Sequence, residues 1–492
     1  MFKKKTKRKV DLKSIAFADG TREISYGTFS QDIAATTDYL RKELPSDVPI
    51  VGISVYTGPY LHWVIHAACT VIGVPTLAMR ANQQVYTDIL VVGSKDPGHS
   101  GALLEFNHAV LNDIRATAAK DKGKGFEQFI HSMQANDSRL NRILLTSGST
   151  GLPKSVPLTN AVNLARHRID MKYRPMTASD RVLITMGRDT TGGFNQTLDC
   201  FFVGATVLML QKGGSDPKQF GAVFRQATRV ITIPDVLVSI LNRVSEPVIG
   251  WEKRTVMIAG SRPDASLFSR CTGSICSELV SFYGSTEVGV VSEASAAQLE
   301  SQPGNVGVLY EGVSVQFSPL TDAPNNEQEP ALIHFKSDWM APGYWVDGEI
   351  EPFENGWFVP GDLGYMLDNN ELIIAGRRDD VLNLQGEKFS AVNIETQLKA
   401  LDGIEDAFVT VVNLASRGRL VVMLKSLLNR ATLKKLASSV ITGTNFYLLV
   451  ADEIPRNHMG KLERVRLTAF CQKTLEQAPK AGSLPPGNAS SP

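Results

Sequence analysis

The sequence predicts an α/β fold, in which parallel or mixed sheets are covered by helices. Short strand-like apolar segments alternate with amphipathic helical segments through most of the chain, the pattern of folds with parallel strands. At 492 residues the chain is too long for one compact core, so two or three domains are expected. From Val306 to Gly343 short strands and turn residues replace long helices. This change predicts a small β subdomain at about residues 303–375.

The first elements show the alternation. Residues 23–26 read as a short strand entering a helix, on which Thr28 and Gln31 have capping-box spacing. A buried strand at 49–55 and a helix at 60–72 follow. Further strands are expected at 75–77, 143–145, 156–158, 182–184, 207–210, 230–233 and 256–259.

Composition limits the classes of function. Apolar residues make up 43% and charged residues 21%, as in a soluble globular protein, and a net charge of +1 favours no nucleic-acid, membrane or acidic partner. The longest apolar runs, such as 201–210, are too short to span a bilayer and suit a buried strand. The five cysteines contain no CxxC pair, so we expect reduced thiols in a cytoplasmic protein and no metal bound by them.

The two ends of the chain are predicted to be disordered. Residues 1–13 carry a cluster of lysines and arginines with no apolar signal segment after it, and residues 476–492 are rich in Pro, Gly, Ser and Ala. The basic arm could contact nucleic acid or an acidic surface, but a solvated arm is the favoured interpretation.

Two histidines, His62 and His66, lie four residues apart on the helix at 60–72 and could form a metal pair. The glutamate of an HExxH motif is missing between them. Ordinary packing is therefore the favoured interpretation.

A glycine-rich segment joins the strands at 143–145 and 156–158. Its hydroxyls and backbone N–H groups can surround phosphate oxygens, and its lysine supplies a mobile positive charge. Pro153 replaces the glycine that a Walker A loop places before its lysine, so the segment is not of that type. A solvated loop is the ordinary alternative. The candidate phosphate-binding residues are Thr146, Ser147, Gly148, Ser149, Thr150, Gly151 and Lys154.

A second motif is Tyr283-Gly284-Ser285-Thr286-Glu287, directly after a predicted strand. An aromatic ring can stack on a purine, a hydroxyl can reach a phosphate, and a carboxylate can hold Mg²⁺. The same residue types also occur in ordinary turns.

Three further motifs follow. Asp362 lies in a glycine-bounded turn, where a fixed carboxylate can accept both ribose hydroxyls, although an Asx turn is the simpler interpretation. The next motif comprises two nearby segments, Gly376-Arg377 to Val381 and Gly386-Glu387-Lys388. Gly460-Lys461 lies near the end of the predicted folded region.

Taken in order, these five motifs resemble those of the adenylate-forming superfamily of acyl- and aryl-CoA synthetases, peptide-synthetase adenylation domains and luciferases. The resemblance runs from about Glu23 to about Leu467. It implies a large N-terminal AMP-binding domain of layered α/β sheets over residues 14–378. It also implies a small mobile α+β C-terminal domain over 379–475, with its hinge at Asp379.

The resemblance also implies a reaction, in which a carboxylate attacks the α-phosphorus of ATP and gives an acyl-adenylate and pyrophosphate. Such chemistry depends mainly on positioning and charge stabilisation. Lys461 would be the catalytic lysine, Thr286 would contact the α-phosphate and Glu287 would carry Mg²⁺. Tyr283 would lie against adenine, and Asp362 with Arg377 would bind the ribose.

In the second implied step the acyl group passes to a thiol, either of coenzyme A or of a carrier-protein phosphopantetheine. Rotation at Asp379 would bring Gly386 and Lys388 to the thiol approach. The alternatives are an amino-acid adenylation enzyme that loads a carrier protein and an amide synthetase that passes the acyl group to an amine. A non-catalytic or light-emitting relative is a further alternative.

By the same resemblance, an acyl pocket is lined by Asp189, Thr191, Phe194, Asn195, Ala259, Gly260 and Ser261. Thr191 occupies the position where amino-acid-activating relatives have an aspartate, which disfavours an α-amino acid. The segment is too polar for a fatty-acid tunnel, so a small or medium aryl or polar carboxylic acid is expected. The alternative is that Asp189 caps a turn and Asn195 caps a helix beginning near Gln196.

Overall fold

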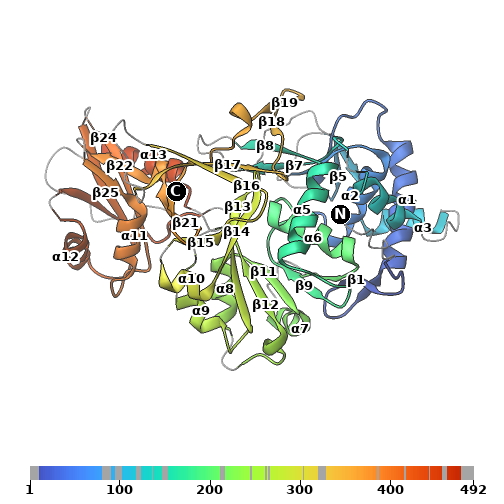
Figure 1. Ribbon diagram of the computed structural model, residues 1–492, viewed down its shortest axis with the longest axis horizontal. Helices are drawn as coiled ribbons and strands as arrows, with labels where there is room; N and C mark the ends of the chain where they lie inside the picture. Colours follow the sequence, from blue (N-terminus) through green and yellow to red (C-terminus); the bar gives the residue numbers. More distant parts are fainter. Residues whose placement is uncertain are drawn as a thin grey trace. The chain divides into compact units, whose positions relative to one another are not determined.

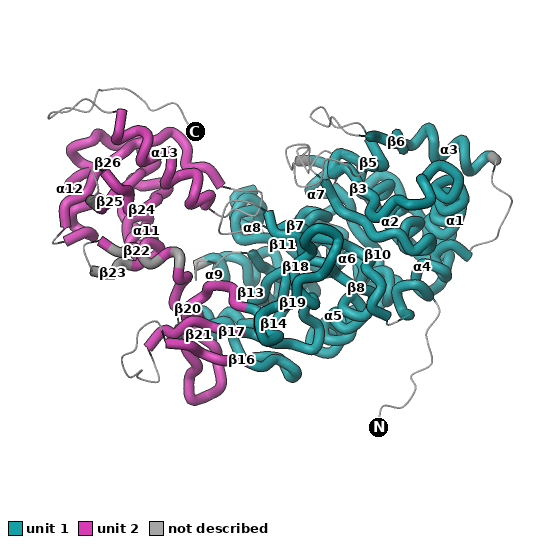
Figure 2. The backbone as a smooth tube through the Cα atoms, turned by 90° about the horizontal axis from the view of Figure 1, so that it is seen from above, with its two compact units in different colours: residues 1–146, 153–314, 335–358 teal, residues 147–152, 315–334, 359–492 magenta. Residues whose placement is uncertain are grey.

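The computed structural model describes residues 10–79, 90–94, 102–117, 124–135, 137–146, 153–210, 217–243, 247–260, 263, 266–302, 304–319, 329–384, 387–414, 417–442, 444–456 and 462–477. The chain divides into two compact units (Figure 2). Unit 1 comprises residues 1–146, 153–314 and 335–358, and unit 2 comprises 147–152, 315–334 and 359–492.

Unit 1 contains two large sheets with helices packed on them (Figure 1), which confirms the predicted α/β class. The first has the order β14 (Gly289–Ser295), β13 (Glu278–Ser285), β12 (Thr255–Ile258), β11 (Arg229–Thr232), β9 (Arg181–Ile184), β10 (Thr206–Leu208), β1 (Ile15–Ala18), β2 (Glu23–Ser25). The second has the order β6 (Leu103–Glu105), β5 (Leu90–Gly93), β3 (Val51–Ser54), β4 (Thr76–Met79), β7 (Leu140–Thr146), β8 (Lys154–Thr159). Most neighbours in both sheets are parallel, and the antiparallel pairs β1–β2, β13–β14 and β7–β8 lie at edges.

The helices of unit 1 follow the strands in alternation. They are α1 (Tyr26–Glu43), α2 (Pro59–Ile72), α3 (His108–Thr117), α4 (Gly125–Met133), α5 (Asn160–Tyr173), α6 (Thr191–Val203), α7 (Pro217–Gln226), α8 (Pro234–Leu241), α9 (Ser266–Cys271) and α10 (Ala296–Ser301). A short strand, β15 (Asn305–Val308), and a hairpin of β18 (Gly343–Val346) and β19 (Glu349–Pro352) complete the unit.

The start of α1 corrects the predicted capping box. Thr28 and Gln31 lie inside the helix, which begins at Tyr26, and the N-cap is Ser25, whose side chain accepts a hydrogen bond from the Thr28 N–H. Both Ser25 and Thr28 can cap a helix. Ser25 does so because the preceding strand β2 ends there, paired with β1.

The core between α1, α2 and α6 is aromatic. Trp63 stacks on Phe194 at 5.5 Å between ring centroids, and Phe201 meets Trp63 and Phe29 at 5.1 and 5.3 Å. All four side chains are buried. The prediction that the run 201–210 suits one buried strand is therefore wrong. Its first residues end α6, and Gly204 caps that helix with a left-handed φ of 82°. Within this run only Thr206–Leu208 form a strand. Apolarity alone did not distinguish a buried helix end from a buried strand.

Unit 2 begins with strands of one sheet, in the order β21 (Glu371–Arg377), β20 (Asp362–Met366), β17 (Ala331–Ser337) and β16 (Val313–Ser318). The first residues of β16 and the last residues of β17 are assigned to unit 1. An α+β region follows, with β22 (Val381–Leu384), β23 (Glu387–Ser390), α11 (Ala391–Lys399), β24 (Asp406–Leu414), β25 (Arg417–Lys425), α12 (Arg430–Val440), β26 (Phe446–Val450) and α13 (Arg464–Glu476). Strand β25 pairs antiparallel with β24 and parallel with β26.

Several predicted features can be placed only in part. Residues 1–9 of the basic arm and 478–492 of the tail lie outside the described residues.

The five cysteines are buried free thiols. In the described ranges, no helix is both long and apolar enough to cross a bilayer.

Candidate functional site

The predicted phosphate loop connects the two strands of an antiparallel hairpin. Strands β7 and β8 pair so that Thr146 lies opposite Lys154, while residues 147–152 between them lie outside the described residues. The Lys154 ammonium lies 4.7 Å from the ring centroid of Tyr344, a residue of β18. A lysine over an aromatic face is a favourable cation–π pair, so Tyr344 gives this exposed side chain a preferred position.

The second motif crosses the turn between β13 and β14, and its glycine is sterically required. A Cβ added to Gly284 would lie 2.1 Å from the Gly289 carbonyl oxygen and 2.8 Å from the Val290 Cα. The pairing of the two strands is irregular between Tyr283 and Gly284. The Tyr283 ring is half-buried and lies 5.9 Å from the ring of Phe335.

Tyr344 also contacts the carboxylate of the second motif. Glu287 is only 7% exposed, and its Oε1 accepts a hydrogen bond from the Tyr344 hydroxyl at 3.3 Å. Burial, together with the Glu287 charge, raises the pKa of Tyr344, so the phenol stays protonated as the donor. Tyr344 therefore brings together Lys154 and Glu287, which the sequence analysis assigned to different motifs.

A buried arginine that the sequence analysis missed, Arg166 of α5, holds the backbone of the same turn. Its Nη2 donates to the carbonyl oxygens of Thr286 at 2.8 Å and Glu287 at 3.4 Å, and its Nε donates to that of Trp339 at 3.1 Å. Burial lowers the pKa of Arg166 to about 10, and the charges of Asp170 and Glu287 oppose this shift. No local motif surrounds Arg166 in the sequence.

A hydrogen bond joins the predicted acyl-pocket segment to the second motif. The Thr191 hydroxyl donates to the Thr286 hydroxyl at 2.6 Å. Thr190 caps α6, because its side chain accepts from the Gly193 N–H at 3.1 Å. The alternative in which Asn195 caps a helix beginning near Gln196 is therefore wrong, since Asn195 lies inside α6.

The other predicted pocket residues differ in their exposure. Asp189 is half-buried, whereas Phe194 is fully buried in the aromatic core. Ala259 and Gly260 follow β12, and Gly260 has a left-handed φ of 97°. Ser261 lies outside the described residues.

Next to Asp189 lies a second buried arginine that the sequence analysis missed, Arg142 of β7. Its guanidinium contacts the Thr76 hydroxyl at 3.0 Å, the His62 Nε2 at 3.2 Å and the Arg188 carbonyl at 3.1 Å. Burial lowers the pKa of Arg142 to about 9, and the Asp189 charge opposes this shift. His62 thus packs against an arginine, and His66 lies 2.8 Å from the Thr76 hydroxyl through its Nδ1.

Behind the motif, α5 and α6 share a buried acid pair, Asp170 and Asp199. Gln196 donates to both carboxyl groups, at 3.1 and 3.4 Å, and Arg174 pairs with Asp170. Burial raises the pKa of each carboxyl to about 7. Arg174 also lies 4.2 Å from the ring of Phe282, which precedes the motif, so this network supports β13.

In unit 2, the structure brings together the two predicted ribose-binding residues. Asp362 begins β20 and lies opposite Arg377 at the end of β21, with the Arg377 Nε 3.5 Å from an Asp362 carboxylate oxygen. Arg377 also donates to the Pro360 carbonyl at 2.6 Å. The sequence separates these residues by a whole hairpin, and antiparallel pairing joins them.

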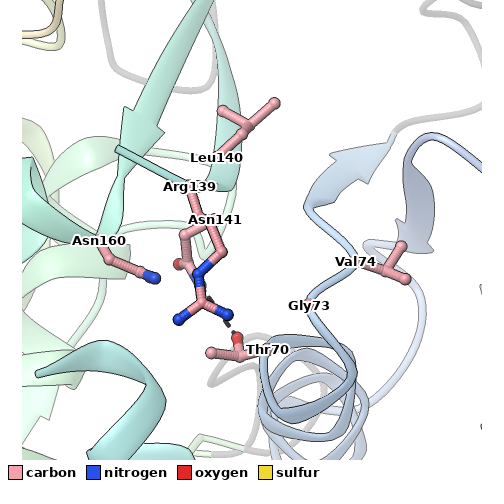
Figure 3. A pocket seen from close by; sticks show the side chains of 7 residues that line it. All are labelled: Thr70, Gly73, Val74, Arg139, Leu140, Asn141 and Asn160. Carbon is pink, nitrogen blue, oxygen red and sulfur yellow. Dashed lines mark hydrogen bonds between the residues drawn. The ribbon is translucent and has the colours of Figure 1, made fainter. Parts of the chain in front are cut away.

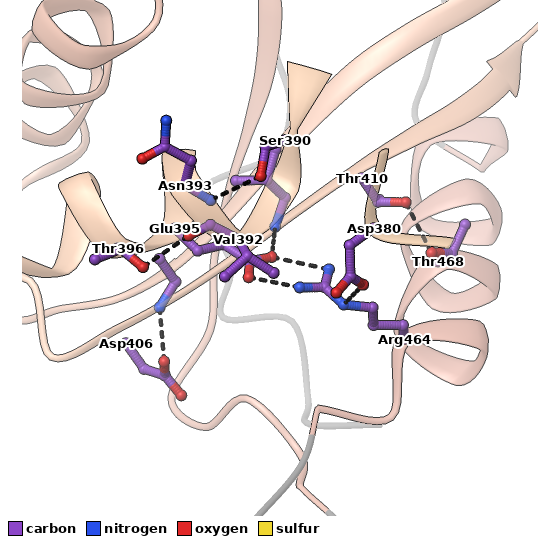
Figure 4. A network of polar contacts seen from close by, with 12 residues as sticks. Asp380, Ser390, Val392, Asn393, Glu395, Thr396, Asp406, Thr410, Arg464 and Thr468 are labelled. Atoms are coloured by element: carbon purple, nitrogen blue, oxygen red, sulfur yellow. Dashed lines mark hydrogen bonds and ion pairs between the residues drawn. The ribbon is translucent and has the colours of Figure 1, made fainter. Parts of the chain in front are cut away.

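The predicted hinge residue Asp379 lies in the 3₁₀ turn Arg378–Asp380. Its neighbour Asp380 pairs with the Arg464 Nε at 2.6 Å, and Arg464 also donates to both Glu395 carboxylate oxygens (Figure 4). Gly386, Lys461 and the Lys388 side chain lie outside what the structure describes. The predicted roles of Asp379, Gly386, Lys388 and Lys461 stay predictions.

A shallow polar pocket lies elsewhere in unit 1. It is lined by Thr70, Gly73, Val74, Arg139, Leu140, Asn141 and Asn160, none of which is a candidate site residue (Figure 3). Asn141 donates to the Thr70 hydroxyl at 3.1 Å. In the described part of the chain, no group of three His, Cys, Asp or Glu residues could hold a metal ion.

Residues 106–345 match the family described as AMP-binding enzyme. Among curated proteins, the mitochondrial malonate–CoA ligase of Bos taurus is 26% identical over 392 residues, which cover 69% of this chain and 66% of that protein. The nicotinic acid–CoA ligase of Aspergillus fumigatus is 27% identical over 367 residues, covering 66% and 62%. The matched part therefore spans just under two thirds of these relatives' length.

Among solved structures, the ATP-bound MatB from Rhodopseudomonas palustris has a TM-score of 0.78 at 19% identity, covering 94% of this chain and 97% of that one. The O-succinylbenzoate coenzyme A synthetase of Bacillus subtilis, in complex with ATP and magnesium, has a TM-score of 0.75 at 17% identity, covering 92% and 96%. These likenesses extend the shared fold over both units. Residues 106–345 are therefore similar to the AMP-binding enzyme family, and the chain shares the fold of these two solved structures.

Proposed function

We propose that the protein is an AMP-forming acid–thiol ligase. It activates a small carboxylic acid with ATP to an acyl-adenylate, releases pyrophosphate, and passes the acyl group to a thiol. The observation that carries this proposal is the 2.6 Å hydrogen bond between Thr191 and Thr286. It joins the segment expected to bind the acid to the hydroxyl expected to contact the α-phosphate, the two groups that must meet in the first step.

The residues around Glu287 fit a magnesium ion. Mg²⁺ prefers oxygen ligands, keeps several waters, and is commonly held by one or two protein carboxylates together with substrate phosphates. Glu287 supplies one such carboxylate, whose Oε1 lies 3.3 Å from the Tyr344 hydroxyl. Bound there, the ion would neutralise negative charge on the phosphates.

The chain's own residues have distinct tasks in the first step. Thr286 orients the α-phosphate. Thr191 donates a hydrogen bond to the Thr286 hydroxyl and so fixes the rotamer of Thr286. Lys154 neutralises the leaving phosphates from a position set by the ring of Tyr344. Lys461 supplies the positive charge that bridges the α-phosphate and the attacking carboxylate. Asp362 and Arg377 bind the ribose.

Coenzyme A is the proposed acceptor, because the curated relatives named above are CoA ligases. A carrier-protein phosphopantetheine is the second candidate, favoured by the 25% identity to a linear gramicidin synthase subunit of Brevibacillus parabrevis over 56% of this chain. Buried reduced cysteines fit the cytoplasm as the location. The substrate is proposed to be a small or medium aryl or polar acid, because Asp189 and Thr191 make the predicted pocket polar.

The test is pyrophosphate exchange into ATP across a panel of aliphatic, aryl, dicarboxylic and amino acids, followed by acyl transfer to coenzyme A or to a holo carrier protein. We expect exchange with a subset of non-amino acids, and transfer to coenzyme A. Asp189→Ala and Asn195→Ala should change the ranking of acids while the KM for ATP stays near the wild-type value. An unchanged ranking would remove these residues from the pocket, and no exchange with any acid would contradict the proposed activity.

A further inference from the structure

Arg166 is buried, yet it forms no direct ion pair in the described part of unit 1. Its side chain is 3% exposed, and the three hydrogen bonds of its guanidinium all go to backbone carbonyl oxygens. Its Nη1 finds no hydrogen-bond partner among the described residues. Burying a charge in this way is costly, so a neutral side chain would serve packing alone better.

The three accepted carbonyls belong to two segments that meet at the candidate site. Those of Thr286 and Glu287 lie in the turn between β13 and β14, and that of Trp339 lies just before β18, which carries Tyr344. Trp339 itself donates through its indole N–H to the Val290 carbonyl at 3.0 Å. One guanidinium thus fixes the backbone on both sides of the Glu287–Tyr344 contact.

We propose that Arg166 is a positioning residue for adenylate formation. It holds the Thr286–Glu287 turn so that the threonine hydroxyl faces Thr191 and the glutamate carboxylate faces Tyr344. It touches neither ATP nor the acid, and it acts through the backbone of Thr286, which would contact the α-phosphate, and of Glu287, which would hold Mg²⁺. The inference rests on the proposed function.

The helix that carries Arg166 is itself held in place. One turn further along α5, Asp170 pairs with Arg174 and accepts from Gln196 of α6. Arg174 also pairs with Glu293 of β14 at 3.0 Å. Arg166 therefore projects from a helix fixed against both α6 and the β13–β14 hairpin, which is the rigid support that a positioning side chain requires.

A planar fork of donors is the feature that this role needs. Arginine can bond two neighbouring carbonyls and a third group at once, whereas a lysine ammonium is a single charged point on a flexible stem. Arg166→Lys keeps the positive charge and loses this geometry. Arg166→Met keeps the approximate volume and loses both.

Arg254 offers a matched control in the same unit. It is also fully buried, donates to the carbonyls of Ala227 at 2.9 Å and Ile275 at 2.8 Å, and lies 4.6 Å from the ring of Phe224. It belongs to no motif of the candidate site. Arg254→Lys therefore removes the same kind of contacts without touching the Thr286–Glu287 turn.

The experiment measures pyrophosphate exchange against Mg²⁺ and ATP concentration, acyl transfer from a preformed acyl-adenylate, and thermal midpoints, in the full chain. We expect Arg166→Lys to lower the kcat of exchange about 10²-fold, as a misplacement of about 1 Å does, and to raise the half-saturating Mg²⁺ concentration several-fold. Arg166→Met should be worse than Arg166→Lys, and both should transfer the acyl group at near wild-type rates. Arg254→Lys should lose thermal stability with unchanged Mg²⁺ dependence.

Two results would overturn the inference. One is that the Arg166 variants match Arg254→Lys in exchange and Mg²⁺ dependence. The other is that both Arg166 variants fail to fold while Arg254→Lys folds, which would make Arg166 structural. A wild-type protein without exchange on any acid would instead contradict the proposed function, so the two failures can be told apart.

Discussion

Gly284→Ala tests whether the close approach of β13 and β14 sets the geometry of the second motif. The new Cβ would lie 2.1 Å from the Gly289 carbonyl oxygen and 2.8 Å from the Val290 Cα, both backbone atoms. Ordinary contact needs more than 3.4 Å. The strands must therefore move apart by about 1 Å, because no flexible side chain can give way. Overpacking of this kind costs about 1–3 kcal/mol of folding free energy.

The same displacement moves Thr286 and Glu287, which follow the glycine by two and three residues. We expect a lower urea midpoint and a loss of about 10²-fold in pyrophosphate exchange, since shifts of about 1 Å have that effect on positioned groups. Gly58→Ala is the control, because a Cβ at Gly58 meets nothing within 4 Å. If Gly284→Ala matched Gly58→Ala in both stability and exchange, the steric reasoning would be refuted.

Three further predictions follow from the proposed roles and the buried acid pair. Lys461→Ala should reduce adenylate formation by about 10²-fold or more and spare thiol transfer from a preformed acyl-adenylate; equal losses in both half-reactions would contradict its role. Asp379→Pro should slow thiol transfer more than adenylation, because proline fixes φ near −65°; wild-type rates in both steps would exclude the hinge. Burial raises the pKa of Asp199 to about 7 from an ordinary value of 3.8, so the folded protein keeps a proton that the unfolded chain has lost. This contribution to stability is complete below about pH 4 and is lost as pH rises towards 7, by at most about 1.4 kcal/mol per pH unit for one proton. Between pH 5 and 7, the free energy of unfolding, measured in urea, should therefore fall less for Asp199→Asn than for the wild type. If it fell equally in both proteins, the acid pair would not share a retained proton.

The sequence predicted the fold class and most strands of the two large sheets of unit 1, because alternation of short apolar segments with helical segments is a local signal. It placed Thr286 and Glu287 in one motif, and the structure adds Tyr344 from a distant hairpin, which no spacing could have indicated. The start of α6 was missed because Thr190, Thr191 and Asn195 are all residue types that can cap a helix. The turn at Gly187 selects Thr190. The Gly187 carbonyl oxygen accepts hydrogen bonds from the Thr190 N–H and the Thr190 hydroxyl.

Buried charges were the other feature missed. In the sequence, Arg142 and Arg166 look like ordinary arginines of a strand and a helix, and exposure is the usual expectation for that residue type. Tertiary packing makes them buried donors to backbone carbonyls. A useful signal would have been that Arg142 directly precedes the apolar residues 143–145 of a predicted buried strand, where a charged side chain is unusual.

The central claim is that a carboxylate oxygen of the acid attacks the α-phosphorus of ATP. It is tested most directly by running the reaction with coenzyme A and an ¹⁸O-labelled acid that supports exchange, and then measuring the mass of the nucleotide product. We expect AMP carrying one ¹⁸O atom from the acid, because the thiol attacks the acyl carbon and the bridging oxygen stays on the phosphate. Unlabelled AMP, or ADP with the label in inorganic phosphate, would contradict it.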